Sequence, residues 1–192
     1  MHKIYFRYGT MYSGKSTDLI KSYLSDQRYK KVIALKPSLD TRDDEIRSRI
    51  INVNIPCVTF TPEESIISKI AEYFDANYCV PDVIYIDEIQ FCTDEQIIEL
   101  HELSFHSPIM CYGLKNSFTG ELFPAITTLL SIAEDVKEIK HSCCMCRRKA
   151  THNLLVRDDK PIYDGEIVNI EGENPNEKYY AVCRKHFFEP IL

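Results

Sequence analysis

The sequence has no long apolar run, no recognisable leader, no internal repeat and no low-complexity segment. Because no hydrophobic stretch approaches the roughly 20 residues that a membrane-spanning helix needs, we expect no membrane segment and no membrane partner. Met1, His2 and Lys3 lead directly into an expected strand, which leaves no room for a signal or transit peptide. The cytoplasm is therefore the expected location. The 192 residues suit one domain of ordinary size with a small appendage.

Positive charge is also in short supply. The chain has 23 Lys and Arg residues against 29 Asp and Glu residues, and its net charge is −6. This balance disfavours a general attraction to the phosphate backbone of nucleic acids, so no nucleic-acid partner is expected. The basic run Arg147, Arg148 and Lys149 is the best candidate for a local patch, and a solvated turn beside a metal site is its simpler interpretation.

The 8 cysteines fall into two groups. In a chain without an expected leader, they indicate thiols or metal ligands rather than disulfides. Four lie scattered in apolar segments and are interpreted as small buried hydrophobic residues: Cys57, Cys79, Cys92 and Cys111. The others gather late in the chain and need a different explanation.

Residues 9–16 carry the pattern G-x-x-x-x-G-K-S of a phosphate-binding loop. The glycines let backbone N–H groups converge on phosphate oxygens, Lys15 reaches the outer phosphates, and the Ser16 hydroxyl can bind Mg²⁺. A strand at 4–8 and a helix at 17–26 flank the loop, so the positive helix N-terminus points at the ligand. A nucleoside triphosphate is predicted to bind at Gly9, Thr10, Met11, Tyr12, Ser13, Gly14, Lys15 and Ser16.

Short apolar runs alternate with helical patterns over roughly the first 140 residues. Strands are predicted at 4–8, 32–35, 57–60, 83–86 and 108–112, and helices at 17–26, from 61 to about 75, and from 93 onward. The charged stretch 38–52 is predicted to be a surface loop. The alternation predicts an α/β fold, a P-loop parallel sheet with helices on both faces and ligands at the carboxyl ends of its strands. Segments become short near His141, which predicts a nucleotide-binding domain at 1–140 and a small zinc-binding domain at 141–192.

An acidic pair, Asp87 and Glu88, directly follows the predicted strand 83–86. Asp87 would hold Mg²⁺ opposite Ser16, and Glu88 would accept a proton from the group that attacks the γ-phosphate. An exposed acidic turn is the alternative, and the phosphate loop argues against it. The pair does not identify the nucleophile, because an ATPase would use Glu88 to position water and a kinase would use it to deprotonate a substrate hydroxyl.

Two ligand pairs, Cys143-x-x-Cys146 and Cys183-x-x-His186, are separated by 36 residues. Together they supply the four ligands of a tetrahedral zinc site, and no position is left open for substrate, so the zinc is predicted to be structural. The segment between the pairs is expected to form a hairpin or loop of its own. Cys144 offers a competing frame, but its spacing to Cys146 is too tight. Free thiols plus a surface histidine are the alternative.

The sequence resembles the thymidine kinases of the cellular and bacterial type, which carry a zinc-bearing lasso. The matching runs spread over nearly the whole chain in the family's order: residues 9–16, 87–91, 113–123, Cys143 with Cys146, and 179–186. The resemblance implies a P-loop domain with a C-terminal zinc-binding lasso. It also implies transfer of the γ-phosphate of ATP, with Mg²⁺, to the 5′-hydroxyl of thymidine (or of deoxyuridine), which gives dTMP from thymidine.

The resemblance also assigns residue roles. Glu88 matches the general base, Gln90 would join Asp87 near the phosphates of ATP, and Asn153 stands where a residue lining the base pocket is expected. The thymine base would be enclosed by Met11, Phe91, Leu114, Phe118, Phe123 and Tyr179. Plain core packing is the alternative for each aromatic residue taken alone. A homotetramer and feedback inhibition by dTTP are implied as well, and Arg42 could stabilise charge in the cleft.

Two rival functions stay open from the residues alone. The first is a P-loop ATPase whose zinc module binds nucleic acid, against which the net charge of −6 counts. The second is a non-catalytic nucleotide-binding protein, against which the intact Lys15, Ser16, Asp87 and Glu88 count. ATP turnover that requires thymidine and is indifferent to DNA would remove the first rival.

Overall fold

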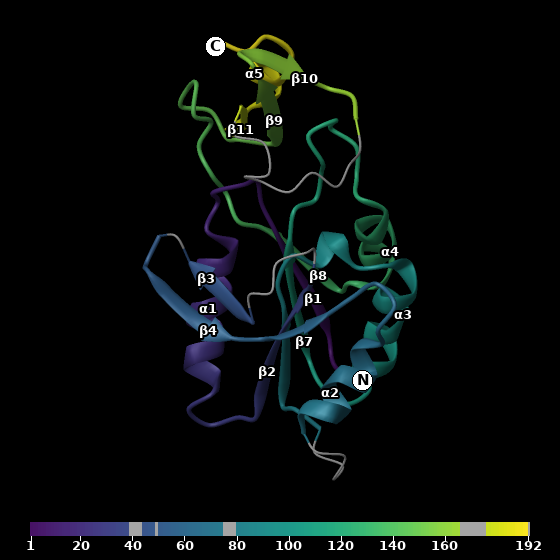
Figure 1. Ribbon diagram of the computed structural model, residues 1–192. Helices are drawn as coiled ribbons and strands as arrows, with labels where there is room; N and C mark the ends of the chain where they lie inside the picture. The colour runs from purple at the N-terminus through teal and green to yellow at the C-terminus, as the bar shows by residue number, and fades with distance from the viewer. Residues whose placement is uncertain (39–43, 49, 75–79, 166–175, 192) are drawn as a thin grey trace.

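A computed structural model of the chain describes residues 1–38, 44–48, 50–74, 80–165 and 176–191. Its centre is a six-stranded sheet with the order β5-β2-β6-β7-β1-β8, in which every neighbouring pair is parallel (Figure 1). The strands are β1 (Ile4–Tyr8), β2 (Val32–Pro37), β5 (Val58–Phe60), β6 (Val83–Ile86), β7 (Ile109–Gly113) and β8 (Asp135–Glu138). The five predicted strands are present, whereas β8 was not among them.

Helices lie on both faces of this sheet, as Figure 1 shows. They are α1 (Lys15–Asp26) on one face and α2 (Ile66–Tyr73), α3 (Asp94–Leu103) and α4 (Pro124–Ile132) on the other. Alternate residues of a strand point to opposite faces. Ile84 and Ile86 of β6 therefore join the apolar cluster that contains residues of α2, α3 and α4, whereas Val83 and Tyr85 join the cluster that contains residues of α1. The predicted α/β fold class is confirmed.

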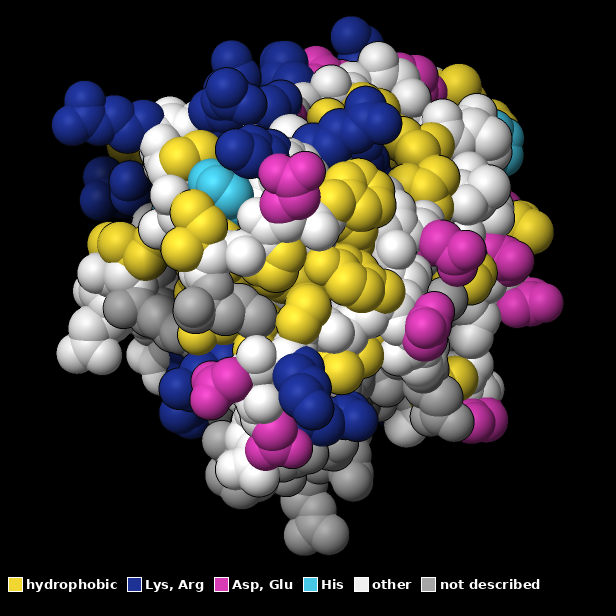
Figure 2. Space-filling model, turned by 90° about the horizontal axis from the view of Figure 1, so that it is seen from above, with side chains coloured by type: hydrophobic (Ala, Val, Ile, Leu, Met, Phe, Trp, Pro, Cys, Tyr) yellow, Lys and Arg dark blue, Asp and Glu magenta, His cyan; other side chains and the backbone are white. Residues whose placement is uncertain are grey.

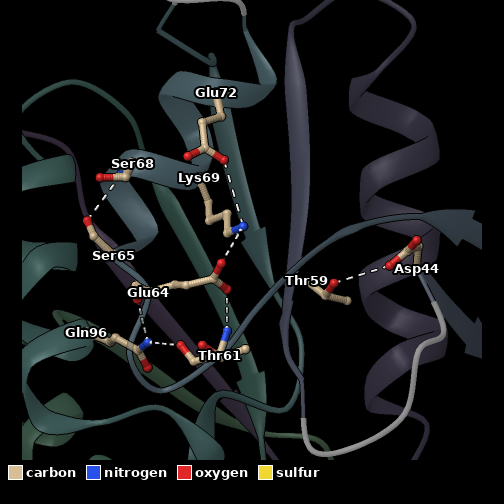
Figure 3. Close-up of polar contacts among 9 residues, drawn as sticks. All are labelled: Asp44, Thr59, Thr61, Glu64, Ser65, Ser68, Lys69, Glu72 and Gln96. Atoms are coloured by element: carbon tan, nitrogen blue, oxygen red, sulfur yellow. Dashed lines mark hydrogen bonds and ion pairs between the residues drawn. The ribbon is translucent and has the colours of Figure 1, made fainter.

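Helix starts follow their capping residues. The Thr93 hydroxyl accepts a hydrogen bond from the Gln96 N–H, and the Gln96 side chain accepts one from the Thr93 N–H, so α3 begins where it was predicted. The prediction that a helix starts at residue 61 was wrong. Ser65 caps α2 instead by accepting from the Ser68 N–H, while Glu64 bonds back to the Thr61 N–H at 2.8 Å (Figure 3).

The predicted surface loop at 38–52 was also wrong in part. Strands β3 (Glu45–Ser48) and β4 (Val53–Pro56) form an antiparallel hairpin that packs against α1. Ile46 and Ile55 face each other in the hairpin and are each 2% exposed, because alternate residues of this charged segment point inward. Residues 39–43, with Arg42, and the predicted end of the second helix near residue 75 lie outside the described residues.

The C-terminal unit, residues 141–191, has a sheet and a core of its own. Strands β9 (His152–Arg157), β10 (Lys160–Ile162) and β11 (Glu177–Val182) are antiparallel in the order β10-β9-β11, and α5 (Arg184–Phe188) follows. The hairpin expected between the two ligand pairs is therefore present. The unit sits at the carboxyl ends of the parallel strands, over the phosphate loop (Figure 1).

The surface at this end of the molecule is partly basic. Figure 2, a view onto this end, shows Lys and Arg side chains gathered toward one side around exposed hydrophobic ones. Arg147, Arg148 and Lys149 are exposed, and the Lys149 ammonium lies 2.7 Å from a carboxylate oxygen of Glu138. These observations fit a solvated basic turn. Among the described helices, none has both the length and the apolar character required to span a lipid bilayer.

Candidate functional site

The phosphate loop connects β1 to α1 and has the shape that its glycines permit. Gly14 has a φ of 89°, in the left-handed region that favours glycine. A Cβ on Gly9 would lie 2.3 Å from the Ser13 hydroxyl oxygen and 2.7 Å from the Ile139 carbonyl oxygen, so no larger residue fits there. Helix α1 begins at Lys15, two residues earlier than predicted, which places its N-terminus directly at the loop.

Lys15 is buried within the loop. Its ammonium donates a hydrogen bond to the Thr10 carbonyl oxygen at 3.0 Å, and that oxygen also accepts from the Ser13 N–H at 3.3 Å. Burial lowers the pKa of Lys15, and the nearby charges of Glu88 and Asp87 act against this shift. A buried ammonium whose hydrogen-bond partner among the described residues is a carbonyl oxygen is suited to an anionic ligand such as a phosphate.

Asp87, at the end of β6, meets Ser16 as the sequence predicted. The Ser16 hydroxyl donates to a carboxylate oxygen of Asp87 at 2.9 Å, and Asp87 is only 3% exposed. Burial and then the charge of Glu88 raise the pKa of Asp87 to about 7, although Ser16 and Lys15 oppose the shift. Burial and the neighbouring charge of Glu88 disfavour the ionised Asp87 carboxylate, and a cation would offset this cost. The Ser16 hydroxyl and the Asp87 carboxylate offer the oxygen ligands that Mg²⁺ prefers.

Glu88 has an unusual backbone and a defined side-chain partner. Its φ of 51° lies in the left-handed region, and the side chain is half-buried. The Gln90 amide donates to a Glu88 carboxylate oxygen at 2.6 Å and accepts from the Leu114 N–H at 2.9 Å. Gln90 therefore links Glu88 to the segment after β7. A Cβ on Gly113 would come within 2.5 Å of the Gln90 oxygen, so this link also depends on glycine.

The predicted base-pocket residues lie in several environments. Phe91 and Phe123 form an edge-to-face pair with centroids 5.8 Å apart, and both, like Leu114, pack with the main apolar cluster. Phe118 is buried, and a Cβ on Gly165 of the C-terminal unit would lie 3.5 Å from its ring. Met11 in the loop and Tyr179 on β11 are half-buried. The pocket as a whole stays a prediction, and core packing accounts for part of this set.

A cavity of about 100 Å³ lies between the phosphate loop and the C-terminal unit. Its lining includes Tyr8, Gly9 and Thr10 at the phosphate loop, Lys115 after β7, and Thr151 and Asn153 of the C-terminal unit. Sequence reasoning did not assign Tyr8, Lys115 or Thr151 to any site. Their positions at strand ends beside the loop are the signal that could have found them.

The four predicted zinc ligands come together in the C-terminal unit. Their ligand atoms all lie within 4.8 Å of one another, with 3.4 Å between the Cys143 sulfur and the His186 Nδ1 and 3.8 Å between the sulfurs of Cys146 and Cys183. Zinc–sulfur bonds of about 2.3 Å in a tetrahedron require sulfurs about 3.8 Å apart, so the set fits zinc. Cys144 is exposed and does not belong to the cluster.

Of the scattered cysteines, Cys92 and Cys111 are buried as predicted. Cys57 is only half-buried, because it lies just before the edge strand β5 rather than inside the sheet, so its predicted burial was wrong. Cys79 lies outside the described residues.

The fold and the site together define a P-loop protein that binds nucleoside triphosphates. A profile of the thymidine kinase family matches residues 2–187. The thymidine kinases of Streptococcus pyogenes serotype M3 and Streptococcus agalactiae serotype Ia are each 36% identical to this chain over 196 aligned positions, which include 100% of both chains. The chain therefore belongs to the thymidine kinase family.

Among solved structures, the Legionella pneumophila ATPase DotB is similar to 77% of this chain and 43% of its own, with a TM-score of 0.42 and 14% identity. This likeness is too distant to support any conclusion about the chain.

The raised pKa of Asp87 predicts a pH-dependent stability of the metal-free and nucleotide-free protein. Because this pKa is about 7 in the folded state against an ordinary 3.8, the folded state binds more protons between these values. The stability contributed by Asp87 is therefore fully present below about pH 4 and lost as the pH rises through about 7. The melting temperature of Asp87→Asn relative to the wild type should rise from about pH 5 to about pH 8 in scanning calorimetry. A difference that stays constant over this pH range would contradict the prediction.

Proposed function

We propose that the protein is a thymidine kinase, which transfers the γ-phosphate of ATP to the 5′-hydroxyl of thymidine to give dTMP, or to that of deoxyuridine to give dUMP. The supporting observation is the meeting of Ser16, Asp87 and Glu88 beside the phosphate loop, in a chain that belongs to the thymidine kinase family over its whole length. Family membership supports the nucleoside as acceptor, which the acidic pair alone could not distinguish from water.

The proposed chemistry assigns a task to each of these groups. Lys15 and the backbone N–H groups of residues 9–16 bind and orient the triphosphate. Mg²⁺ held by Ser16 and Asp87 would neutralise charge on the phosphates. Glu88 takes the proton from the 5′-hydroxyl as that oxygen attacks the γ-phosphorus in line, and the bond to the β–γ bridging oxygen breaks to release ADP. Gln90 was expected near the phosphates. Through its hydrogen bond to Glu88, it holds the carboxylate of the general base in place.

The nucleoside would lie between the two parts of the chain. We place its base against Met11, Phe91, Leu114, Phe118, Phe123 and Tyr179. An apolar and aromatic box suits a flat base, and backbone groups near Tyr179 can bond its polar edge. Closure of the C-terminal unit over the base would exclude water, which would otherwise compete for the phosphoryl group.

Zinc in the Cys₃His cluster has a structural task in this scheme. Strand β11, which carries Tyr179, runs directly into Cys183, so the cluster fixes the end of the strand that reaches the base. We accordingly propose the division into a domain at 1–140 and a zinc-binding lasso at 141–192. A homotetramer, feedback inhibition by dTTP and a cytoplasmic location are further proposals, supported by the family resemblance.

A nucleoside panel tests the reaction. With labelled ATP and Mg²⁺, we expect phosphate to appear on thymidine and deoxyuridine but not on deoxycytidine or deoxyadenosine, because the predicted backbone contacts would match the imide edge of thymine. Product analysis by chromatography provides the measurement. ATP hydrolysis that DNA stimulates and thymidine does not would instead support the rival ATPase.

Glu88→Gln tests the general base. The amide cannot accept the proton, so kcat should fall about 100-fold or more, while the affinity for ATP changes little. Steady-state kinetics and calorimetric binding separate the two effects. Glu102→Gln, an exposed carboxylate on α3, is the matched control and should leave both unchanged. Turnover of the Glu88 variant within about tenfold of the wild type would refute the assignment.

Metal analysis tests the zinc cluster. The wild-type protein should contain one zinc per chain, Cys146→Ser should lose it, and Cys144→Ser should retain it because Cys144 lies outside the cluster. Loss of zinc should weaken thymidine binding more strongly than ATP binding, since the cluster directly follows β11, which carries Tyr179, whereas the phosphate loop belongs to the other part of the chain. Full zinc retention by Cys146→Ser would show that the ligand set is wrong.

A further inference from the structure

Asn153 of β9 joins three segments that are distant in the sequence. The residue is 3% exposed. Its side-chain oxygen accepts a hydrogen bond from the Met11 N–H in the phosphate loop at 2.8 Å, and its side-chain nitrogen donates to the Asn116 carbonyl oxygen at 3.2 Å. Both polar groups of this amide are thus engaged by the backbone of the nucleotide-binding part of the chain.

The loop peptide that Asn153 holds is the one that also holds Lys15. The Met11 N–H and the Thr10 carbonyl belong to a single planar peptide group and point in opposite directions. The Thr10 oxygen accepts from the Lys15 ammonium at 3.0 Å. Asn153 and Lys15 therefore form hydrogen bonds with opposite ends of one rigid peptide group. A rotation of that group would move the Thr10 oxygen, which is the partner of Lys15.

We propose that Asn153 is a positioning residue that sets the Lys15 ammonium through the peptide group between Thr10 and Met11. The inference rests on the proposed function, because it takes the phosphate loop to be the ATP site. Hydrogen bonds in a chain polarise one another, so the bond that the Asn153 oxygen accepts from the Met11 N–H also makes the Thr10 oxygen a better acceptor for Lys15. Without it, the ammonium is drawn toward the carboxylates of Asp87 and Glu88, whose charges act on it.

The C-terminal sheet determines where the Asn153 side chain lies. Asn153 pairs with Ala181 of β11, and the Ala181 carbonyl oxygen accepts from the Cys144 N–H at 3.0 Å. The Thr151 N–H bonds in turn to the Val182 carbonyl oxygen at 2.8 Å. The register that these bonds fix carries the amide to the phosphate loop, so the geometry of the C-terminal unit is transmitted to Lys15.

Calorimetric titration with Mg·AMP-PNP, in the absence of nucleoside, tests the proposal. Asn153→Leu keeps the volume but removes the acceptor, so its affinity for the analogue should fall roughly tenfold. Asn153→Asp keeps an acceptor oxygen for the Met11 N–H and should stay within about threefold of the wild type. No loss in the Leu variant, or an equal tenfold loss in the Asp variant, would overturn the proposal.

Gln96 provides a control for plain loss of stability. It is also a buried amide, 2% exposed, whose oxygen accepts from the Thr93 N–H and whose nitrogen donates to the carbonyl oxygens of Thr61 and Glu64 (Figure 3). Gln96→Leu should lower the melting temperature by as much as Asn153→Leu and leave analogue affinity unchanged. An equal loss of affinity in both would reduce Asn153 to a structural role. Failure of the wild type to bind the analogue would instead refute the proposed function.

Discussion

The burial of opposite charges beneath the phosphate loop is the constraint on which the rest of the structure depends. Lys15 is 8% exposed and Asp87 is 3% exposed. Burial lowers the pKa of Lys15 and raises that of Asp87, so it favours the neutral form of each side chain. Removing charges from water is costly unless partners replace the lost hydration. Within the described chain, Lys15 donates to the Thr10 carbonyl, and the Asp87 carboxylate accepts from the Ser16 hydroxyl and the Glu88 N–H. A site with this imbalance is suited to a ligand that brings both anionic oxygens and a cation.

This charged centre can exist only because the strands are parallel. Strands β6 and β1 are separated by β7, yet their carboxyl ends meet at the same edge, which allows Ser16 at the start of α1 to reach Asp87. Gln90 links the acidic pair to the neighbouring strand, since it donates to the Glu88 carboxylate and accepts from the Leu114 N–H after β7. Glu88 is thus linked to the end of the intervening strand β7, and the small Gly113 leaves room for that link.

Predictability from the sequence follows the range of the interaction that determines each feature. The phosphate loop, the acidic pair and the Cys-x-x-Cys and Cys-x-x-His pairs were predictable, because the residues of each motif are close in the sequence and its chemistry restricts their spacing. The hairpin of β3 and β4 was missed because charged and polar residues flank its inward-facing residues. The two isoleucines that pair across the hairpin, Ile46 and Ile55, are therefore isolated in the sequence. The hydrogen bonds of the Asn153 side-chain amide join residues that are 142 and 37 positions apart in the sequence, and no local pattern encodes such a distance.

The C-terminal unit therefore does more than cover the nucleotide site. A lid that only closed over the base would need contacts with the ligand and a hinge, and it could leave the phosphate loop unchanged. Here a buried amide of the unit bonds the loop backbone directly, and the partner carbonyl of Lys15 lies in the same peptide group. Because a peptide group is rigid, the unit cannot move away without freeing that group to rotate. In the proposed scheme, positioning of the base and positioning of the phosphate are consequently coupled within one structural element, the sheet whose strand β11 ends at the Cys₃His cluster.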